Sequence, residues 1–329
     1  MGEITIEAAG RAVRFTSPDK VLFPDRGWTK LDVAEHYLRC APGAVRATLR
    51  RPCSLKRWPN GVGADFFFTK RAPSTLREAV AVRFPSARPG RMAIVRDVSD
   101  IVDQVQLGVI DLNPWPSRAP DTDHPDELRL DLDPTPGFGF DDCREVAGAC
   151  RALLAERGLE GWPKTSGSRG IHVYARIHPQ WTFHEVRRAA LAFAREIERR
   201  LPGLATTEWW KEERRGVFID FNQNARDKTI AAAYSLRHTG LVSAPFGWNE
   251  VGTIDPEEMT LEGFRDRWSA VGDLTDGIDD HPGDLGGLLA MADADEAAGL
   301  GDAPWPPHYP KQPGEPPRVQ PSKRRSDNG

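Results

Sequence analysis

The residues best suited to do chemistry are two aspartates that alternate along one apolar run. The segment ELRLDLDP predicts a strand over residues 127–133, and Asp131 and Asp133 stand near its end. Because residues i and i+2 of a strand point to the same face, the two carboxylates must project together. Carboxylates that close repel each other unless a cation lies between them, and their hard oxygen atoms suit Mg²⁺ or Mn²⁺.

A second short apolar run carries a third acid. Residues 216–221 read GVFIDF and predict another strand, with Asp220 near its end. If the two strands are neighbours, three carboxylates can hold two divalent ions, an arrangement that promotes in-line attack at a phosphorus atom. Aspartates with this spacing also occur in solvated turns, so the spacing alone leaves both interpretations open.

A turn made of small residues lies between these two segments. The sequence KTSGSRGIHVYARI starts at Lys164 and predicts a strand, a turn and a second strand. Small residues let backbone N–H groups face an anion, while Ser166, Arg169 and His172 add side-chain donors at the same place. The segment therefore suits the phosphates of a nucleoside triphosphate, and a plain β-turn beside a core histidine is the alternative.

Further polar and aromatic residues stand at the ends of apolar runs. Gln223 follows GVFIDF closely, and Arg237 ends the motif YSLR. Lys56 lies in KRWPNG, while Phe67 and Phe68 lie in DFFFTK. Aromatic rings flanked by cations suit stacking on unpaired bases, whereas a buried strand would explain the same phenylalanines equally well.

The charge of the chain is unevenly distributed. The 329 residues carry a formal net charge of −4, yet residues 11–71 hold thirteen Lys or Arg and five acids. Residues 271–303 hold nine acids and no Lys or Arg. This split predicts a basic surface for phosphates and an acidic region elsewhere, with a solvated surface of mixed charge as the alternative.

The elements that must position these residues follow from local patterns. Thr29 predicts the start of a helix over 29–50 that Pro42 must kink or split. The other expected elements are strands at 2–8, 12–15, 52–58, 65–70 and 105–112, and helices at 140–157 and 181–200. Strands and helices alternate loosely, which indicates a mixed α/β or α+β fold.

Composition sets the remaining expectations. No apolar run reaches the roughly 18 residues of a membrane span, and the N-terminus lacks the pattern of a secretory signal. We therefore expect a cytoplasmic protein with no membrane partner. The four cysteines show no zinc-type spacing and are expected to be buried thiols. Residues 301–329 are Pro-rich, end in a basic cluster and predict an extended tail rather than core.

Seven motifs in their order along the chain resemble the polymerase domain of bacterial non-homologous end-joining ligases, which belongs to the archaeo-eukaryotic primase superfamily. They cover about residues 12–270 and read DKVLFP, KRWPNGV, FFTK, RLDLDP, TSGSRGIHVY, VFIDFNQN and YSLR. The chain also resembles the stand-alone actinobacterial primase-polymerases of that superfamily. The resemblance implies a primase-type catalytic core with an RRM-like sheet. We expect one catalytic domain over 1–300, with a basic DNA-binding part at 1–110 and the metal and nucleotide site at 110–270.

The resemblance also assigns roles to residues. The metal-binding carboxylates are Asp131, Asp133 and Asp220. The contacts to the incoming nucleotide are Ser166, Arg169, His172, Gln223, Arg237 and Lys56. Lys20 and Lys30 match the family residues that bind the 5′-phosphate of a gap or break. Phe67 and Phe68 match the aromatic residues that stack on the template. Many relatives read HPW where this chain has Asn113 before Pro114 and Trp115, so an ionisable group is missing there.

The function implied by the resemblance is template-dependent polymerisation in DNA repair. The enzyme would use two Mn²⁺ or Mg²⁺ ions to add NTPs or dNTPs, preferably ribonucleotides, to a primer 3′-OH at short gaps or broken ends with a 5′-phosphate. A DNA ligase or end-joining factor is the expected partner. Two alternatives remain: a DNA-end-binding module without catalysis that recruits a ligase, and a metal-dependent phosphoesterase. The first has no need of the carboxylates, and the triphosphate-binding turn argues against the second.

Overall fold

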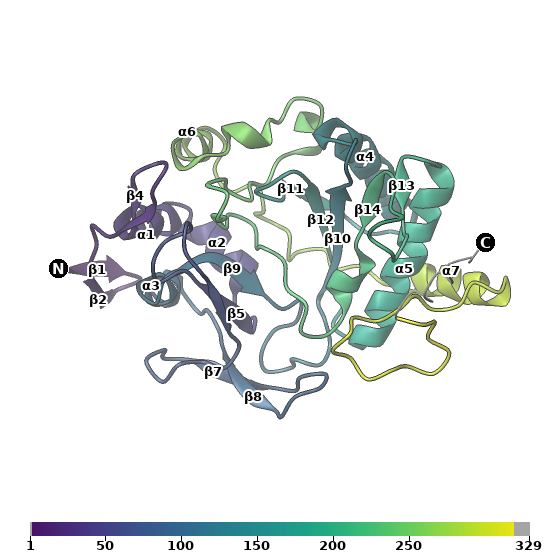
Figure 1. Ribbon diagram of the computed structural model, residues 1–329, viewed down its shortest axis with the longest axis horizontal. Helices are drawn as coiled ribbons and strands as arrows, with labels where there is room; N and C mark the ends of the chain where they lie inside the picture. The colour runs from purple at the N-terminus through teal and green to yellow at the C-terminus, as the bar shows by residue number, and fades with distance from the viewer. Residues whose placement is uncertain (1, 319–329) are drawn as a thin grey trace, which may run out of the picture.

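The site is built on a five-stranded sheet near the centre of the computed structural model, which describes residues 2–318 (Figure 1). The strands lie in the order β11-β12-β10-β14-β13, and only the β13–β14 pair is parallel. Their bounds are Glu127–Pro134 for β10, Trp162–Thr165 for β11, Ile171–Arg176 for β12, Ala205–Thr206 for β13 and Val217–Ile219 for β14.

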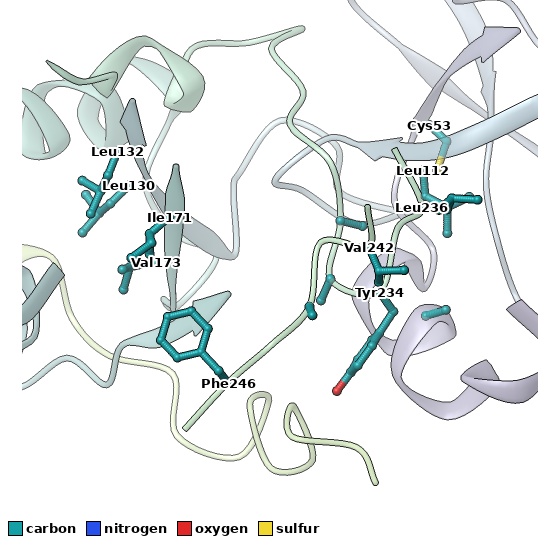
Figure 2. Packing of buried hydrophobic residues seen from close by; sticks show 14 of the residues in the cluster. Cys53, Leu112, Leu130, Leu132, Ile171, Val173, Tyr234, Leu236, Val242 and Phe246 are labelled. Carbon is teal, nitrogen blue, oxygen red and sulfur yellow. The ribbon is translucent and has the colours of Figure 1, made fainter. Parts of the chain in front are cut away.

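Two long helices cover the apolar face of this sheet. They are α4 (Phe140–Glu156) and α5 (Phe183–Arg200). Leu130 and Leu132 of β10 lie on this face, and Figure 2 shows them beside Ile171 and Val173 of β12. Alternation along β10 therefore places its leucines in the core and leaves Asp131 and Asp133 on the other face.

A second sheet carries Phe67 and Phe68, two of the DNA-binding candidates. Its strands β6, β5, β8 and β7 lie in that order, and β9 pairs with β5. Their bounds are Cys53–Arg57 for β5, Phe67–Thr69 for β6, Ala79–Val82 for β7, Gly90–Ala93 for β8 and Val109–Pro114 for β9. The hairpin of β1 (Glu3–Ala8) and β2 (Arg11–Thr16), the pair β3 (Val21–Phe23) and β4 (Trp28–Thr29), and helices α1 (Lys30–Arg39), α2 (Ala41–Thr48) and α3 (Val98–Gln106) complete this half.

A buried cluster of charges locks the two sheets together. Glu127, at the start of β10, lies 3.0 Å from the guanidinium of Arg51, just before β5. Glu127 also pairs with Arg129, 2.8 Å away, and with Arg176 of β12. The Arg129 side chain donates to the backbone oxygen of Pro114 at the end of β9. Because buried charges need this full pairing, the cluster fixes how β10 lies against the second sheet.

The local predictions agree with the structure except at two places. The predicted helix over 29–50 is split at Cys40, with Thr29 capping α1 and a proline in the first turn of α2. All four cysteines are free and buried, as expected. The strand predicted at 105–112 is wrong at its start, because α3 runs to Gln106 and β9 begins at Val109. The Asp97 side chain caps α3, and Gly108 turns the chain with a φ of +83°.

The second difference concerns the C-terminal part of the chain. After α6 (Leu261–Val271) and α7 (Gly286–Ala297), residues 302–318 run alongside one end of α5, and Trp305 is buried (Figure 1). They pack against the body of the protein, in contrast to the extended tail expected from their proline content. The basic cluster at the very end lies outside the described residues. Between residues 2 and 318, no helix is both long enough and apolar enough to cross a membrane.

Candidate active site

The three carboxylates meet because the two aspartate-bearing strands are neighbours. β14 pairs antiparallel with β10, so that Leu132 lies opposite Ile219. The backbone N–H of Asp220 donates to the backbone oxygen of Asp131 at 2.9 Å. The strand order on which the sequence interpretation depended is therefore present.

Burial raises the pKa values of all three carboxyls, and repulsion by a neighbouring carboxylate adds to this at Asp133 and Asp220. Burial and the charge of Asp131 raise the pKa of Asp220 to about 6. Burial also raises the pKa of Asp131 to about 6. The pKa of Asp133 rises to about 7, first because of the charge on Asp131, then through burial and Asp220. Such a group of acids gains stability from added positive charge.

The carboxylate oxygens of the three aspartates are the type of ligand that a divalent cation such as Mg²⁺ or Mn²⁺ prefers. Asp131 Oδ1 is buried and has no hydrogen-bond partner, which leaves a hard oxygen ligand available. Throughout the described part of the chain, no three His, Cys, Asp or Glu side chains already converge on one point as a finished metal cluster. The three aspartates are thus neighbours whose oxygens still have to close around an ion.

The small-residue turn lies directly against β10. A Cβ added at Gly170 would come within 2.2 Å of the backbone oxygen of Leu132, so only glycine allows this approach. Ser166 Oγ accepts hydrogen bonds from the N–H groups of Ser168 and Gly170, which makes it the organiser of the turn. Arg169 is exposed beside Asp133 and lowers its pKa. The turn thus brings one cation and several small residues to the carboxylates.

His172 is held by a residue that the sequence analysis did not select. His172 Nε2 lies 3.2 Å from Asp131 Oδ1, across the β10–β12 pair. On its other side, the Lys164 ammonium nitrogen lies 2.6 Å from His172 Nδ1 and donates to Ser243 Oγ, also at 2.6 Å. Burial lowers the pKa values of both Lys164 and His172. When Lys164 donates to Nδ1, the ring proton stays on Nε2 and points into the site.

A second unselected residue, Asp111 of β9, lies between two predicted nucleotide contacts. Its Oδ2 is 3.8 Å from Lys56 Nζ and 3.8 Å from Arg237 Nε, and its Oδ1 is buried without a partner. Arg237 also donates to the backbone oxygen of Ser166 at 2.7 Å, which links this cluster to the turn. The sequence feature that could have identified Asp111 is its position as an acid within the apolar run VIDL. Asn113 lies two residues further along β9, and its amide donates to the Asp111 backbone.

Gln223, a predicted nucleotide contact, lies beside the carboxylates. It stands in the 3₁₀-helix η1 (Phe221–Asn224), directly after Asp220. Its Nε2 donates to Asp220 Oδ2 at 2.9 Å, and it also lowers the pKa of Asp131. The predicted metal and nucleotide residues from β10, β12, β14 and the adjoining turns are therefore brought together.

The DNA-binding candidates lie on the N-terminal half. Lys20 and Lys30 are close enough that the charge of Lys20 helps burial to lower the pKa of Lys30 to about 8. Lys30 is only 6% exposed and donates to Thr16 O and to Gln106 Oε1, which leaves one of its three donors without a hydrogen bond, although the ammonium nitrogen also lies 4.5 Å from the centre of the Phe15 ring. Phe67 and Phe68 are 46% and 54% exposed. Their exposure contradicts the alternative of a buried strand.

Comparison with known proteins agrees with this geometry. The family model of the LigD primase-polymerase domain matches residues 29–275. The multifunctional non-homologous end joining protein LigD of Mycolicibacterium smegmatis is 33% identical over 81% of the chain, and that of Pseudomonas aeruginosa is 31% identical over 75%. The chain spans only about a third of these relatives, 36% and 30% of their lengths.

A solved structure supports the same assignment. The polymerase domain from Mycobacterium tuberculosis Ligase D, in complex with DNA, is similar with a TM-score of 0.76 and 30% identity. The similarity covers 82% of this chain and 99% of that domain, which confirms the mixed fold expected from the sequence. Family model, relatives and structure agree, and the chain belongs to the LigD primase-polymerase domain family.

Proposed function

We propose that the protein is a template-dependent primase-polymerase that adds nucleotides to a primer 3′-OH. Family membership implies a nucleotidyltransferase of end-joining DNA repair. The observation that carries the proposal is the pairing of β10 with β14, which joins Asp131 and Asp133 to Asp220 beside the Ser166 turn. A module that only binds DNA ends would have no use for three neighbouring acids that repel one another.

The residues of the site divide the work of nucleotidyl transfer. Asp131, Asp133 and Asp220 would hold two ions, Mn²⁺ or Mg²⁺, which when bound make the 3′-OH a better nucleophile and neutralise the pyrophosphate that leaves. Ser166 would organise the turn that presents Arg169 to the phosphates, because its Oγ binds the N–H groups of Ser168 and Gly170. Arg169 adds charge beside Asp133.

Three side chains on either side of the turn complete nucleotide binding. His172 Nε2, which lies 3.2 Å from Asp131 Oδ1, would donate to the nucleotide at the edge of the carboxylates. Lys56 approaches from β5 of the second sheet and Arg237 from a segment outside both sheets, and Asp111 lies 3.8 Å from each of them. Gln223 orients the Asp220 carboxylate through its hydrogen bond.

We propose gapped or broken double-stranded DNA with a 5′-phosphate as the substrate. Lys20 and the remaining donor of Lys30 would contact that phosphate, and the contacts carry no sequence information. The exposed rings of Phe67 and Phe68 would stack on template bases. A ribonucleotide preference and a DNA ligase or end-joining partner are part of the same proposal.

One primer-extension experiment tests the function. A 5′-phosphorylated gapped duplex is incubated with rNTPs or dNTPs and with Mn²⁺, Mg²⁺ or EDTA. We expect templated addition that requires a divalent ion and proceeds better with rNTPs. Binding to the gap without extension would favour the end-binding module, and phosphate release without extension would favour a phosphoesterase.

A further inference from the structure

Residues 302–318, here named the C-terminal strap, pack against the part of the chain that carries Asp220. Trp305 and Tyr309 of the strap are 4% and 7% exposed and form a buried cluster with Ala225, the residue after η1. The strap lies beyond the part of the chain that matches the family model. The strap thus touches the 3₁₀-helix η1, which follows Asp220, from the side away from β10.

Arg187 of α5 connects the strap to η1. Its side chain is almost fully buried, and its guanidinium lies over the rings of Trp305 and Phe221, 4.2 Å and 5.2 Å from their centroids. It donates to four acceptors: Asn222 Oδ1 at 2.8 Å, Asp302 Oδ1 at 2.7 Å, and the backbone oxygens of Ala303 and Pro304 at 3.0 Å. One acceptor belongs to η1 and three belong to the strap.

Asn222 links Arg187 to the Asp220 carboxylate through two hydrogen bonds. Its backbone N–H donates to Asp220 Oδ1 at 3.0 Å, while its side chain accepts from Arg187. On the opposite side, the Asn224 side chain bonds both the N–H and the oxygen of Arg129 on β10. The 3₁₀-helix is thus held from two sides, by β10 and by Arg187 with the strap.

We propose that Arg187, held by the C-terminal strap, is a positioning residue that sets the Asp220 carboxylate for metal binding. A buried guanidinium is stable only while its donors are paired, so release of the strap would leave Arg187 with unpaired donors. Docking of the strap and the geometry of η1 are therefore linked. The inference rests on the proposed role of Asp220 as a metal ligand.

The test compares two neighbouring arginines of α5 in the full-length protein. Arg187→Met removes the link to η1, whereas Arg188→Met is a matched control, because Arg188 pairs with Asp293 and Glu296 of α7 instead. Mn²⁺ binding to the DNA-free protein is measured by electron paramagnetic resonance of the free ion. Thermal melting and binding of 5′-phosphorylated DNA are measured in parallel.

We expect Arg187→Met to weaken Mn²⁺ binding by about 10- to 100-fold, as loss of an outer-shell partner does, and to leave DNA binding unchanged. Arg188→Met should stay within about twofold of the wild type. Arg187→Lys, which keeps the charge but not the fork of donors, should fall between the two. Equal Mn²⁺ affinity in Arg187→Met and wild type overturns the proposal.

A second variant keeps the test decisive if Arg187→Met does not fold. Asp302→Asn weakens one strap contact and leaves Arg187 in place. A smaller loss of Mn²⁺ affinity in this variant supports the inference, and wild-type affinity contradicts it. A wild-type protein that binds Mn²⁺ but extends no primer would overturn the proposed polymerase function and leave this inference standing.

Discussion

At the residue scale, the Asp133 carboxyl is the group on which opposing charges act most directly. Asp131 and Asp220 raise its pKa, and Arg169 and Arg214 lower it, but the repulsion is stronger. Asp133 is exposed at the open end of its strand, where an ion or a substrate can reach it. Its charge therefore costs stability in the metal-free protein and is useful only when a cation is bound.

Asp133→Asn should separate these two roles. In EDTA the variant should melt at the same temperature as the wild type or a few degrees higher, because a neutral amide removes the repulsion. Primer extension in Mn²⁺ should be lost. Differential scanning calorimetry and the extension assay measure the two effects. A variant that keeps extending primers would show that Asp133 is not a metal ligand.

Asp111 is the shared counter-ion of two basic side chains, Lys56 and Arg237. Asp111→Asn should leave Lys56 and Arg237 without their shared counter-ion, and Arg237 already lowers the pKa of Lys56. We expect KM for the incoming nucleotide to rise about tenfold, or about 1.4 kcal/mol, with a smaller change in kcat. Asp103→Asn, which breaks the ion pair with Arg11 on the surface of α3, is the control. Equal KM values in wild type and Asp111→Asn would refute this role.

At the element scale, what could be predicted from the sequence depends on how local the signal is. The alternation of apolar and polar residues along 127–133 predicts which side chains of β10 share a face. Thr29 and Pro42 predict that helices α1 and α2 follow one another with a break between them. The pairing of β10 with β14 has no local signal, since about eighty residues lie between the two strands. The partners of Lys164 and Asp111 likewise come from other elements, and the one local sign of Asp111 was an acid within an apolar run.

The C-terminal strap shows why composition misled. Prolines lack the N–H needed for a helix or a sheet ladder, so a Pro-rich stretch predicts an extended tail. Here side chains supply the missing donors. Arg187 satisfies the oxygens of Ala303 and Pro304, and Arg318 donates to the oxygens of Pro306, Tyr309 and Pro310. The local sequence pattern does not predict that two arginines would donate to the backbone oxygens of this segment.

The turn that carries Ser166 provides a prediction about an element. Gly170→Ala should push the turn away from β10, because the new Cβ would meet the Leu132 oxygen, and should reduce both nucleotide binding and stability. Gly148→Ala in the middle of α4 is the matched control. Its Cβ would meet nothing within 4 Å, so it should stabilise the protein by about 0.5–1 kcal/mol. Urea unfolding and nucleotide KM measure both variants, and a Gly170→Ala protein with wild-type values in both would contradict the close approach.

At the scale of the whole molecule, ion pairs neutralise part of both the basic N-terminal segment and the acidic segment at 271–303. Acids of α7 pair with α5, as in the Arg188–Asp293 and Arg199–Asp295 contacts. Many N-terminal cations are also paired, among them Arg11, Arg14, Arg46, Arg51 and Lys70. No ion pair involves Lys20 anywhere in residues 2–318, which agrees with the DNA contact proposed for it.

Lys20 and Phe67 should therefore fail in different ways on DNA. Lys20→Ala should weaken binding to a gap with a 5′-phosphate more than binding to the same gap without it, because it removes one phosphate contact. Phe67→Ala should weaken both by about 1–3 kcal/mol, since base stacking does not depend on the phosphate. Arg14→Gln, an exposed residue that pairs with Glu3, should retain the preference for the phosphate. Fluorescence anisotropy at two salt concentrations measures all three. If Lys20→Ala lost the same affinity on both duplexes, Lys20 would contribute only general attraction to the backbone, and the downstream phosphate would have to be bound elsewhere.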